Sequence, residues 1–332
     1  VPTISVAAGD VNVYDPNFSN PMIHQADAVF EWQFARNTVI SGSYLYSAGR
    51  DLPTFIDLNL NKPTASTLIT ISGGPLDGKT FTVPRYTGTR PNTSFARILS
   101  TQSIVESTYH GFVLQFNRRM TGGVQFQNSY TLSKATDTGQ VSQTFTGSGN
   151  VLDPFDLSKE KGPSNFDARH RFVSSVVWQP EFKTDNRALG MIVNGFTLSP
   201  IFTVQSGRRY SGFTSGNLSG ATTTGPLGAG QSFRTPFLER NSYKFPYPWN
   251  LDLRLSRRFR VTEQASIEFL AEAFNLANRL NVTAVNTTEY RVSASTATTA
   301  TFQYQPAFGT ATAAGNTVYR ERQIQFAIRV RF

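Results

Sequence analysis

The sequence predicts an all-β protein built of antiparallel strands, and three observations lead to that fold class. Apolar and polar residues alternate with a period of two in one segment after another, as side chains do along a strand. No comparably long stretch has the 3.6-residue period of an amphipathic helix. Stretches rich in Gly, Ser, Thr and Pro separate some of these segments, notably 134–167, 207–247 and 291–317.

The alternating segments follow one another along the chain, and each places its apolar residues on one side. In the N-terminal half these residues are Phe30, Trp32 and Phe34; Tyr44 and Tyr46; Phe112, Leu114 and Phe116; and Val124, Phe126, Tyr130 and Leu132. The next segments are marked by Phe172, Val176 and Trp178; Phe196, Leu198, Phe202 and Val204; Leu251, Leu253 and Leu255; and Ile267, Phe269, Ala271 and Ala273. With segments of about 8–12 residues, we expect roughly 12–14 strands.

The last segment has the clearest pattern of all. Its apolar side carries Ile324, Phe326, Ile328, Val330 and Phe332. Its other side carries Gln325, Ala327, Arg329 and Arg331. A final alternating strand that ends in Phe resembles the signal recognised by the outer-membrane barrel assembly machinery, so this strand is expected to guide barrel assembly.

The composition narrows the class of protein. The chain has 332 residues, a formal net charge of +9 and only 16% charged residues, against about a quarter in ordinary soluble domains. It has no Cys, which excludes disulfides, thiolate metal sites and a cysteine nucleophile. It also has no apolar run of about 18 residues, which excludes a transmembrane helix. Membrane-spanning β-strands remain compatible with a mean hydropathy of −0.27, because their two faces average out.

The polar sides of the segments favour a membrane barrel over a soluble sandwich. They carry mostly Gln, Asn, Ser, Thr and Arg, whereas a solvent-facing sheet is usually rich in Lys, Glu and Asp. The short turn at 118–123 contrasts with the long stretches elsewhere, and short turns opposite long loops are typical of outer-membrane barrels. We therefore predict one domain over 1–332: an antiparallel up-and-down transmembrane β-barrel, or the C-terminal part of one, with long loops on one side. The soluble alternative is an extracellular carbohydrate-binding β-sandwich.

One motif points elsewhere at first sight. Residues 73–80 match the phosphate-binding pattern G-x-x-x-x-G-K-[ST], which needs a strand before it and a helix after it. A strand is plausible at Thr67–Ser72, but β-branched residues and Pro84 follow, and these do not open a helix. The Asp77-Gly78 pair instead predicts a hairpin turn, without nucleotide binding.

No residue pattern predicts a metal, a cofactor or catalysis. The histidines stand far apart in the sequence at His24, His110 and His170, and His170 begins a strand, where a hydrogen bond at the barrel rim explains it. The acidic residues of the 134–167 loop do not have EF-hand spacing, and a solvated acidic loop is the expectation for Asp153, Asp156 and Glu160.

The positive charge has a structural interpretation. Basic residues are scattered singly and form no run of 5–8, so nucleic-acid binding is not expected. Arginines on the polar sides of the last strands can pair with glutamates across the sheet, and the rest of the charge can meet anionic lipid headgroups. The residues expected to face the lumen are Arg254, Glu268, Glu272, Gln325, Arg329 and Arg331.

Several phrases resemble the C-terminal barrel portion of Oar-like TonB-dependent outer-membrane receptors. They include DPNFSNPMIHQ (15–25), YLYSAGRDLPTFIDLN (44–59), FTVPRYTGTRPNTSFARI (81–98) and YHGFVLQFNRRMTGGVQFQNSYTLSKATD (109–137). They continue with NFDARHRFVSSVVW (165–178), GFTLSPIFTVQSGRRYSG (195–212), FNLANRLN (274–281) and RQIQFAIRVRF (322–332). The resemblance implies a 22-stranded barrel of the bacterial outer membrane that contains a plug and imports a bulky substrate with energy delivered through TonB.

The sequence carries no plug, TonB box, signal peptide or regulatory-like domain, and about a dozen strands would close only half of such a wall. We therefore expect a fragment, a barrel shortened to close by itself, or a subunit whose strand edges pair with other copies. The expected function is passive or TonB-linked substrate uptake without catalysis. The alternative is a self-assembling structural β protein of an outer-membrane or extracellular tube or filament. Expected partners are outer-membrane lipid, the barrel assembly machinery, TonB through a missing N-terminal part, and further copies through strand edges.

Overall fold

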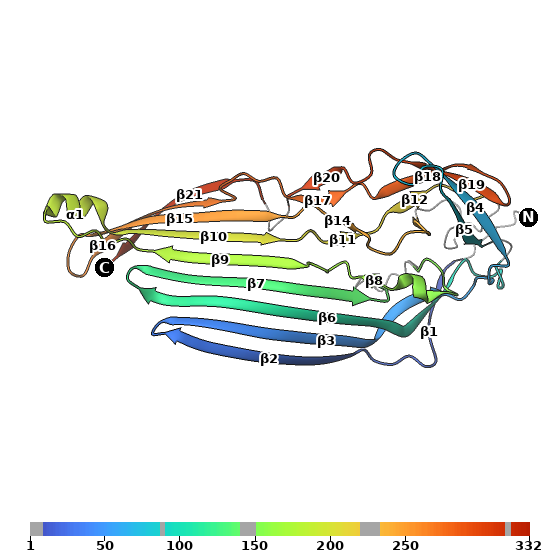
Figure 1. Cartoon of the computed structure of the whole chain (residues 1–332), viewed down its shortest axis with the longest axis horizontal. Coiled ribbons are helices and arrows are strands. Elements are labelled where there is room, and N and C mark those ends of the chain that lie inside the picture. Colours follow the sequence, from blue (N-terminus) through green and yellow to red (C-terminus); the bar gives the residue numbers. More distant parts are fainter. Residues whose placement is uncertain (1–8, 87–89, 140–150, 220–232, 316–319) are drawn as a thin grey trace, which may run out of the picture.

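In the computed structural model, a broad antiparallel sheet dominates the protein, with a smaller sheet at one end (Figure 1). The structure describes residues 9–86, 90–139, 151–219, 233–315 and 320–332. We call the nine strands of the main path of the large sheet the wall. In spatial order they are β2 (Met22–Ala35), β3 (Thr38–Asp57), β6 (Ile98–Thr121), β7 (Val124–Asp137), β9 (His170–Trp178), β10 (Phe196–Gln205), β15 (Trp249–Arg260), β16 (Ser266–Phe274) and β21 (Gln323–Arg331).

The wall has a short-turn end and a long-loop end (Figure 1). At the short-turn end, tight turns join β2 to β3, β6 to β7 and β15 to β16, and the chain also ends there. The connection 179–195 between β9 and β10, which contains the helix α1 (Arg187–Val193), is the longer exception at this end. In the β6–β7 turn, Gly122 and Gly123 have φ of 58° and 76°, a left-handed conformation that favours glycine. The connections 58–97, 138–169, 206–248 and 275–322 lie at the opposite end. This confirms the predicted arrangement of long loops on one side.

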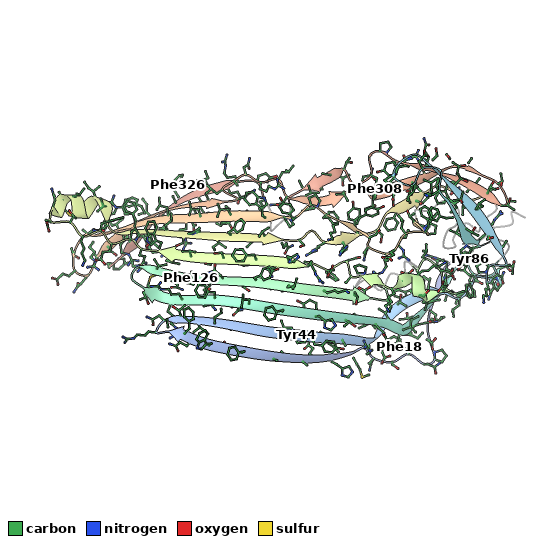
Figure 2. All side chains as sticks on the ribbon, viewed as in Figure 1. Phe18, Tyr44, Tyr86, Phe126, Phe308 and Phe326 are labelled. Atoms are coloured by element: carbon green, nitrogen blue, oxygen red, sulfur yellow. The ribbon has the colours of Figure 1, made fainter. Side chains whose placement is uncertain are left out.

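The two faces of the wall follow the predicted alternation. Cross-strand register aligns Tyr44 with Phe112 and Leu253 with Ala273, so the apolar residues of neighbouring strands share one face. We call this the apolar face and the other the polar face. The apolar face is exposed rather than buried: Phe326 is 80% exposed and Phe30 is 70% exposed. Phe126 and Phe326, labelled in Figure 2, belong to this apolar face.

All nine alternating segments named from the sequence are wall strands. The expected total of roughly 12–14 strands exceeds the nine strands of the wall, because none of the other described strands adds to its main path. Of these, two short strands pair with β6 and β7 beside the main path, two pairs form two-stranded sheets, and six form a second sheet.

The second sheet, which we call the loop sheet, contains the hydrophobic core of the described residues. Its order is β13 (Phe233–Arg234), β12 (Phe213–Ser215), β18 (Thr288–Ser295), β19 (Thr299–Tyr304), β4 (Ala65–Ser72) and β5 (Thr80–Arg85). The buried side chains are Ile69, Ile71, Val83, Leu152, Leu218, Phe233, Tyr290, Ala300 and Phe302. Three long connections contribute strands to this one sheet, and β12–β18 and β4–β19 are parallel pairs between segments far apart in sequence.

The segment that matches the phosphate-binding pattern is a hairpin, as predicted. Strand β4 pairs antiparallel with β5, and Thr70 lies opposite Thr80. Gly73, Gly74 and Gly78 have positive φ, and the Asp77 carboxylate accepts a hydrogen bond from the Gly73 amide at 2.6 Å. A strand, not a helix, follows Lys79, so the backbone amides do not form a phosphate cradle.

Smaller elements complete the described residues. They are β1 (Val11–Tyr14), β8 (Gly162–Pro163), β11 (Arg209–Tyr210), β14 (Tyr243–Lys244), β17 (Val282–Val285), β20 (Ala311–Ala314), the 3₁₀ turn Leu157–Glu160 and the helix α1 (Arg187–Val193). No helix among the described residues has the length and apolar character needed to cross a bilayer.

Candidate functional site: the polar face and the loop sheet

The residues expected to face the lumen meet on the polar face of β15, β16 and β21, near the short-turn end. Register places Arg254 opposite Glu272, and Glu272 opposite Gln325. The Glu272 carboxylate accepts hydrogen bonds from both the Arg254 guanidinium and the Gln325 amide. Three neighbouring strands are therefore linked through one carboxylate.

Glu268 forms a second cluster on the same face of β16, four residues from Glu272 and nearer the turn that joins β15 to β16. Arg329 lies directly opposite it, and the guanidinium groups of Arg258, Arg329 and Arg331 are 3.6–3.7 Å from its Oε2 atom. Ser256 donates a hydrogen bond to Oε1 at 3.1 Å. Arg258 was not predicted from the sequence, although the alternation that identified Arg254 continues to it.

The charges of these clusters differ in exposure. The side chains of Arg254, Arg329 and Arg331 are about half exposed, whereas Glu268 and Glu272 are 11% and 15% exposed. Each glutamate is thus covered by arginines whose outer edges remain accessible. Since four arginines surround two glutamates, this part of the polar face presents net positive charge.

The terminal strand places its predicted apolar residues on the opposite face. Ile324, Phe326, Ile328 and Val330 are all exposed there, as is the terminal Phe332. The other long edge of β21 pairs with no strand among the described residues, because β16 occupies only one side.

Buried arginines hold the long connections to the wall, a feature that the sequence did not predict. The Arg240 guanidinium contacts the Asp137 carboxylate at the end of β7 and donates to the Glu160 carbonyl at 2.7 Å. Arg209, which is only partly buried, pairs with Asp167 at 3.1 Å and so links two of the long connections to each other. Burial lowers the pKa of Arg240 to about 10, which leaves it protonated at neutral pH.

The expectation of a solvated acidic loop is wrong for Asp153 and Glu160, which are both 4% exposed. The Tyr86 hydroxyl donates to Asp153 at 2.6 Å, and Arg234 donates to Glu160 at 2.6 Å. Burial raises the pKa of Glu160, while Arg234 opposes that shift. Asp156 does remain exposed and caps the 3₁₀ turn. The spacing of these residues gave no sign of burial because their partners come from other connections.

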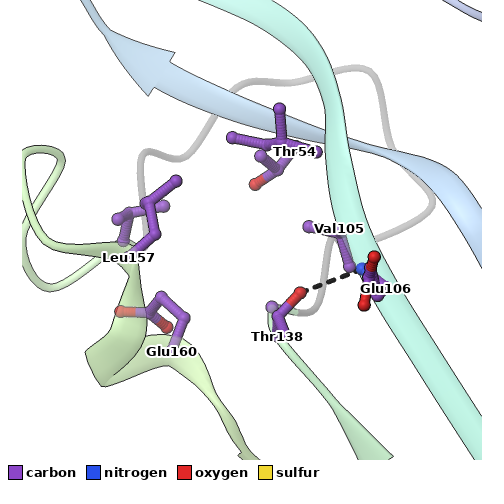
Figure 3. Close-up of a pocket in the computed structure, with 9 residues that line it drawn as sticks. Thr54, Val105, Glu106, Thr138, Leu157 and Glu160 are labelled. Carbon is purple, nitrogen blue, oxygen red and sulfur yellow. Dashed lines mark hydrogen bonds between the residues drawn. The ribbon is translucent and has the colours of Figure 1, made fainter.

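A pocket of about 210 Å³ lies where these connections meet the wall (Figure 3). Thr54 and Val105 contribute to it from β3 and β6, and Leu157 and Glu160 from the 3₁₀ turn. The Glu106 amide donates to Thr138 Oγ1 at 2.9 Å along one side, drawn as the dashed line in Figure 3. Its lining is mixed polar and apolar, and the Glu160 carboxylate in it is already bonded to Arg234 and to the Leu152 amide.

The histidines occupy the apolar face near the long-loop end. The Tyr130 hydroxyl is 2.7 Å from Nδ1 of His170, which confirms the predicted hydrogen bond at the rim. The Tyr44 hydroxyl makes the same contact with His110. No group of three or more metal-ligating side chains gathers anywhere in the described part of the chain.

An antiparallel wall with one exposed apolar face and one polar, charged face defines an outer-membrane β-barrel protein. The sequence accordingly matches the outer membrane beta barrel domain family over residues 1–325, and the chain belongs to this family. It is therefore a protein of the bacterial outer membrane.

Solved structures of outer-membrane proteins align with the chain at low sequence identity. The outer membrane transporter YddB from Escherichia coli aligns with a TM-score of 0.51 and 11% identity, covering 98% of this chain and 34% of YddB. The ferripyoverdine receptor of Pseudomonas aeruginosa and the FrpB iron transporter of Neisseria meningitidis both align with a TM-score of 0.46 and 11% identity. These alignments cover 94% and 96% of this chain, and 27% and 32% of the other proteins. The chain thus spans about a third of the length of these proteins. No curated protein matches the sequence.

Proposed function

We propose that the chain forms part of the wall of a TonB-dependent receptor of the Oar-like type, through which a bulky solute enters the cell. The observation that carries the proposal is the division of the wall into an exposed apolar face and a polar face with the arginine–glutamate clusters. The apolar face meets lipid, and the polar face lines the passage. No chemistry is assigned to the site; its arginines attract and position an anionic part of the solute.

The direction of the edge strands favours this proposal over a self-assembled tube or filament. Eight successive antiparallel pairings separate β2 from β21, so these two edge strands run in the same direction (Figure 1). Copies inserted into a membrane with the same orientation would meet β21 to β2 as parallel strands. Outer-membrane barrels are antiparallel throughout, so closure needs an odd number of further strands between these edges.

The loop sheet supports a receptor role at the other end of the passage. Short turns of outer-membrane barrels face the periplasm and long loops face the exterior, so the sheet of β4, β5, β12, β13, β18 and β19 lies outside the cell. Its core is buried and its strands are cross-paired, which provides a rigid platform for a solute. We propose that the solute contacts this sheet first and the arginine clusters afterwards.

The orientation of the wall is testable because the chain has no cysteine, so one introduced thiol has no background. Gln115→Cys and Leu114→Cys make a matched pair, since these neighbouring residues of β6 are both exposed but lie on the polar and the apolar face. In the membrane-assembled protein, a charged water-soluble maleimide should label position 115 and leave 114 unlabelled. Equal labelling of both positions would overturn the assignment of the faces.

Energy coupling needs a separate measurement. Cells that produce the protein should take up fluorescent solutes larger than general pores admit, and uptake should stop when the proton gradient is dissipated. Substituting Arg329 and Arg331 together by Gln should slow the uptake of anionic solutes more than that of neutral ones. Uptake that continues without a proton gradient contradicts TonB coupling and supports passive passage.

A further inference from the structure

The three histidines of the chain, which are far apart in the sequence, lie in one layer of the apolar face. His24 is on β2, His110 on β6 and His170 on β9, and all three are exposed. Register places Lys134 of β7 directly opposite His110. His170 lies opposite Leu132, which is two residues from Lys134 on the same face of β7. We call His24, His110, Lys134 and His170 the histidine layer. The pattern is a row of basic side chains across neighbouring strands of the wall.

The layer lies one membrane thickness from the short-turn end. His24 and His110 are each 11 residues from the short-turn end of their strands, Lys134 is 10 and His170 is 8. A tilted strand crosses the hydrocarbon in about 9–11 residues. Aromatic and aliphatic residues cover most of the apolar face between these two levels, and the polar Asn128 and Ser174 among them are hydrogen-bonded to each other at 2.6 Å. In a bilayer whose inner boundary is at the short-turn end, the layer therefore lies at the level of the outer-leaflet headgroups.

Two of the imidazoles are held by tyrosines in the same way. The Tyr44 and Tyr130 hydroxyls each lie 2.7 Å from Nδ1 of His110 and His170, and each tyrosine is two residues further into the apolar band. When the hydroxyl donates to Nδ1, the proton of a neutral imidazole is on Nε2. Each histidine then presents an N–H donor at a fixed position on the rim.

The charges near the layer favour an anion. Lys134 is exposed, and no carboxylate of the described residues forms an ion pair with it. The nearest acidic group on the same face of β6 is Glu106, which pairs with Arg50 at 3.9 Å. A lysine flanked by fixed N–H donors matches the chemistry of phosphate, which accepts several hydrogen bonds and carries negative charge.

We propose that the histidine layer binds the phosphate groups of outer-leaflet lipid headgroups. Lys134 supplies the charge, and His110 and His170 on either side supply directed hydrogen bonds, while His24 extends the row to the edge strand. The layer is continuous with the lipid-facing band, which makes membrane lipid its occupant. This inference rests on the proposed lipid contact of the apolar face and adds the kind of lipid that is preferred.

Lipid retention tests the inference. The membrane-assembled protein is placed in phosphatidylcholine nanodiscs with a minor fraction of phosphatidic acid, and bound lipids are counted by native mass spectrometry. Wild type should retain phosphatidic acid over phosphatidylcholine. Lys134→Gln should weaken this retention about fivefold, the effect of one cation at an anionic surface. The double variant His110→Gln/His170→Gln should weaken it further, and Tyr44→Phe/Tyr130→Phe should weaken it without removing any imidazole.

Arg171→Gln is the matched control. Arg171 is exposed at the same height as His170 but follows it on β9, so its side chain is on the polar face. Its loss should leave phosphatidic acid retention unchanged. Equal retention by wild type and Lys134→Gln, or equal losses in Lys134→Gln and Arg171→Gln, would overturn the inference. The labelling of positions 114 and 115 separates the outcomes: if that pattern holds while lipid selectivity is absent, only the headgroup assignment fails.

Discussion

Removing the Arg240 side chain should release a long connection from the wall. Arg240 and its partner Asp137 are 7% and 9% exposed at their side chains, so the pair is buried. Arg240→Ala removes this ion pair together with the hydrogen bonds to the Glu160 carbonyl at 2.7 Å and the Asp137 carbonyl at 3.1 Å. Asp137 is then left as a buried carboxylate without its cation.

The magnitude follows from burial. Breaking a buried ion pair by removing one partner costs about 3–5 kcal/mol, because the remaining charge is uncompensated. An exposed pair is worth only about 0–1 kcal/mol. Arg50 and Glu106 form such a pair at 3.9 Å with side chains 38% and 60% exposed, so Arg50→Ala is the matched control. Arg240→Ala should therefore shift the opening equilibrium of the 206–248 connection by about a hundredfold to a few thousandfold. Arg50→Ala should leave this equilibrium unchanged, because its pair joins β3 to β6.

Hydrogen exchange of the Asn241 amide reports that opening. This amide donates to Ser211 Oγ of the same connection at 2.9 Å, and the Asn241 side-chain amide donates to the Pro163 carbonyl of β8 at 2.7 Å. Opening of the connection around Arg240 should therefore expose the Asn241 amide to exchange. Arg240→Ala should accelerate its exchange strongly and Arg50→Ala should not. The double variant Arg240→Leu/Asp137→Leu should restore much of the protection, because no charge is left unpaired. If Arg240→Ala changes the exchange no more than Arg50→Ala does, the buried pair does not dock the connection.

Three further predictions concern other parts of the molecule. Deleting Phe332 should lower the yield of heat-modifiable barrel in outer-membrane fractions, and an unchanged yield would contradict a role in assembly. Gly207→Ala should cost about 1–3 kcal/mol, since a Cβ would lie 1.7 Å from the Phe245 carbonyl oxygen, whereas Gly42→Ala, with its nearest neighbour at 3.7 Å, should be close to neutral in thermal unfolding. Burial raises the pKa of Glu160 above 4.5, so the docked loop binds this proton more readily than the open loop. The contribution of Glu160 to loop docking is therefore greatest below pH 4.5 and is lost as the pH rises through its raised pKa. Hydrogen-exchange protection of the Leu152 amide, which donates to Glu160, should fall from acid to neutral pH in wild type relative to Glu160→Gln.

The wall could be predicted from the sequence because its signal is local. Alternation within β21 alone separates Phe326 from Arg329, and the same rule assigns faces in β7 and β15 without knowledge of the neighbours. Membrane strands are long and pair with adjacent hairpins, so little non-local information is needed. The pairing of Arg254 with Glu272 follows for the same reason.

The loop sheet could not be predicted in this way. Strands β12 and β13 are three and two residues long, too short for a period to be visible, and β4 pairs in parallel with β19 from more than two hundred residues further along. Asp153 and Glu160 were expected in solvent because an acidic, Gly-rich stretch usually lies there. Their burial depends on Tyr86 and Arg234, which other connections supply.

The two parts of the molecule use arginine in opposite ways, and this separates their roles. In the wall, Arg254, Arg329 and Arg331 cover the glutamates but keep about half of their surface open, so they can exchange partners with a passing anion at little cost. In the long connections, Arg234 and Arg240 are buried, and releasing either one would leave a carboxylate unpaired. Under the proposed function, a solute can draw on the wall charges without unfolding anything, whereas the buried arginines only hold the long connections in place. We therefore propose that discrimination between solutes belongs to the surface of the loop sheet, and that the wall below it favours passage by charge alone.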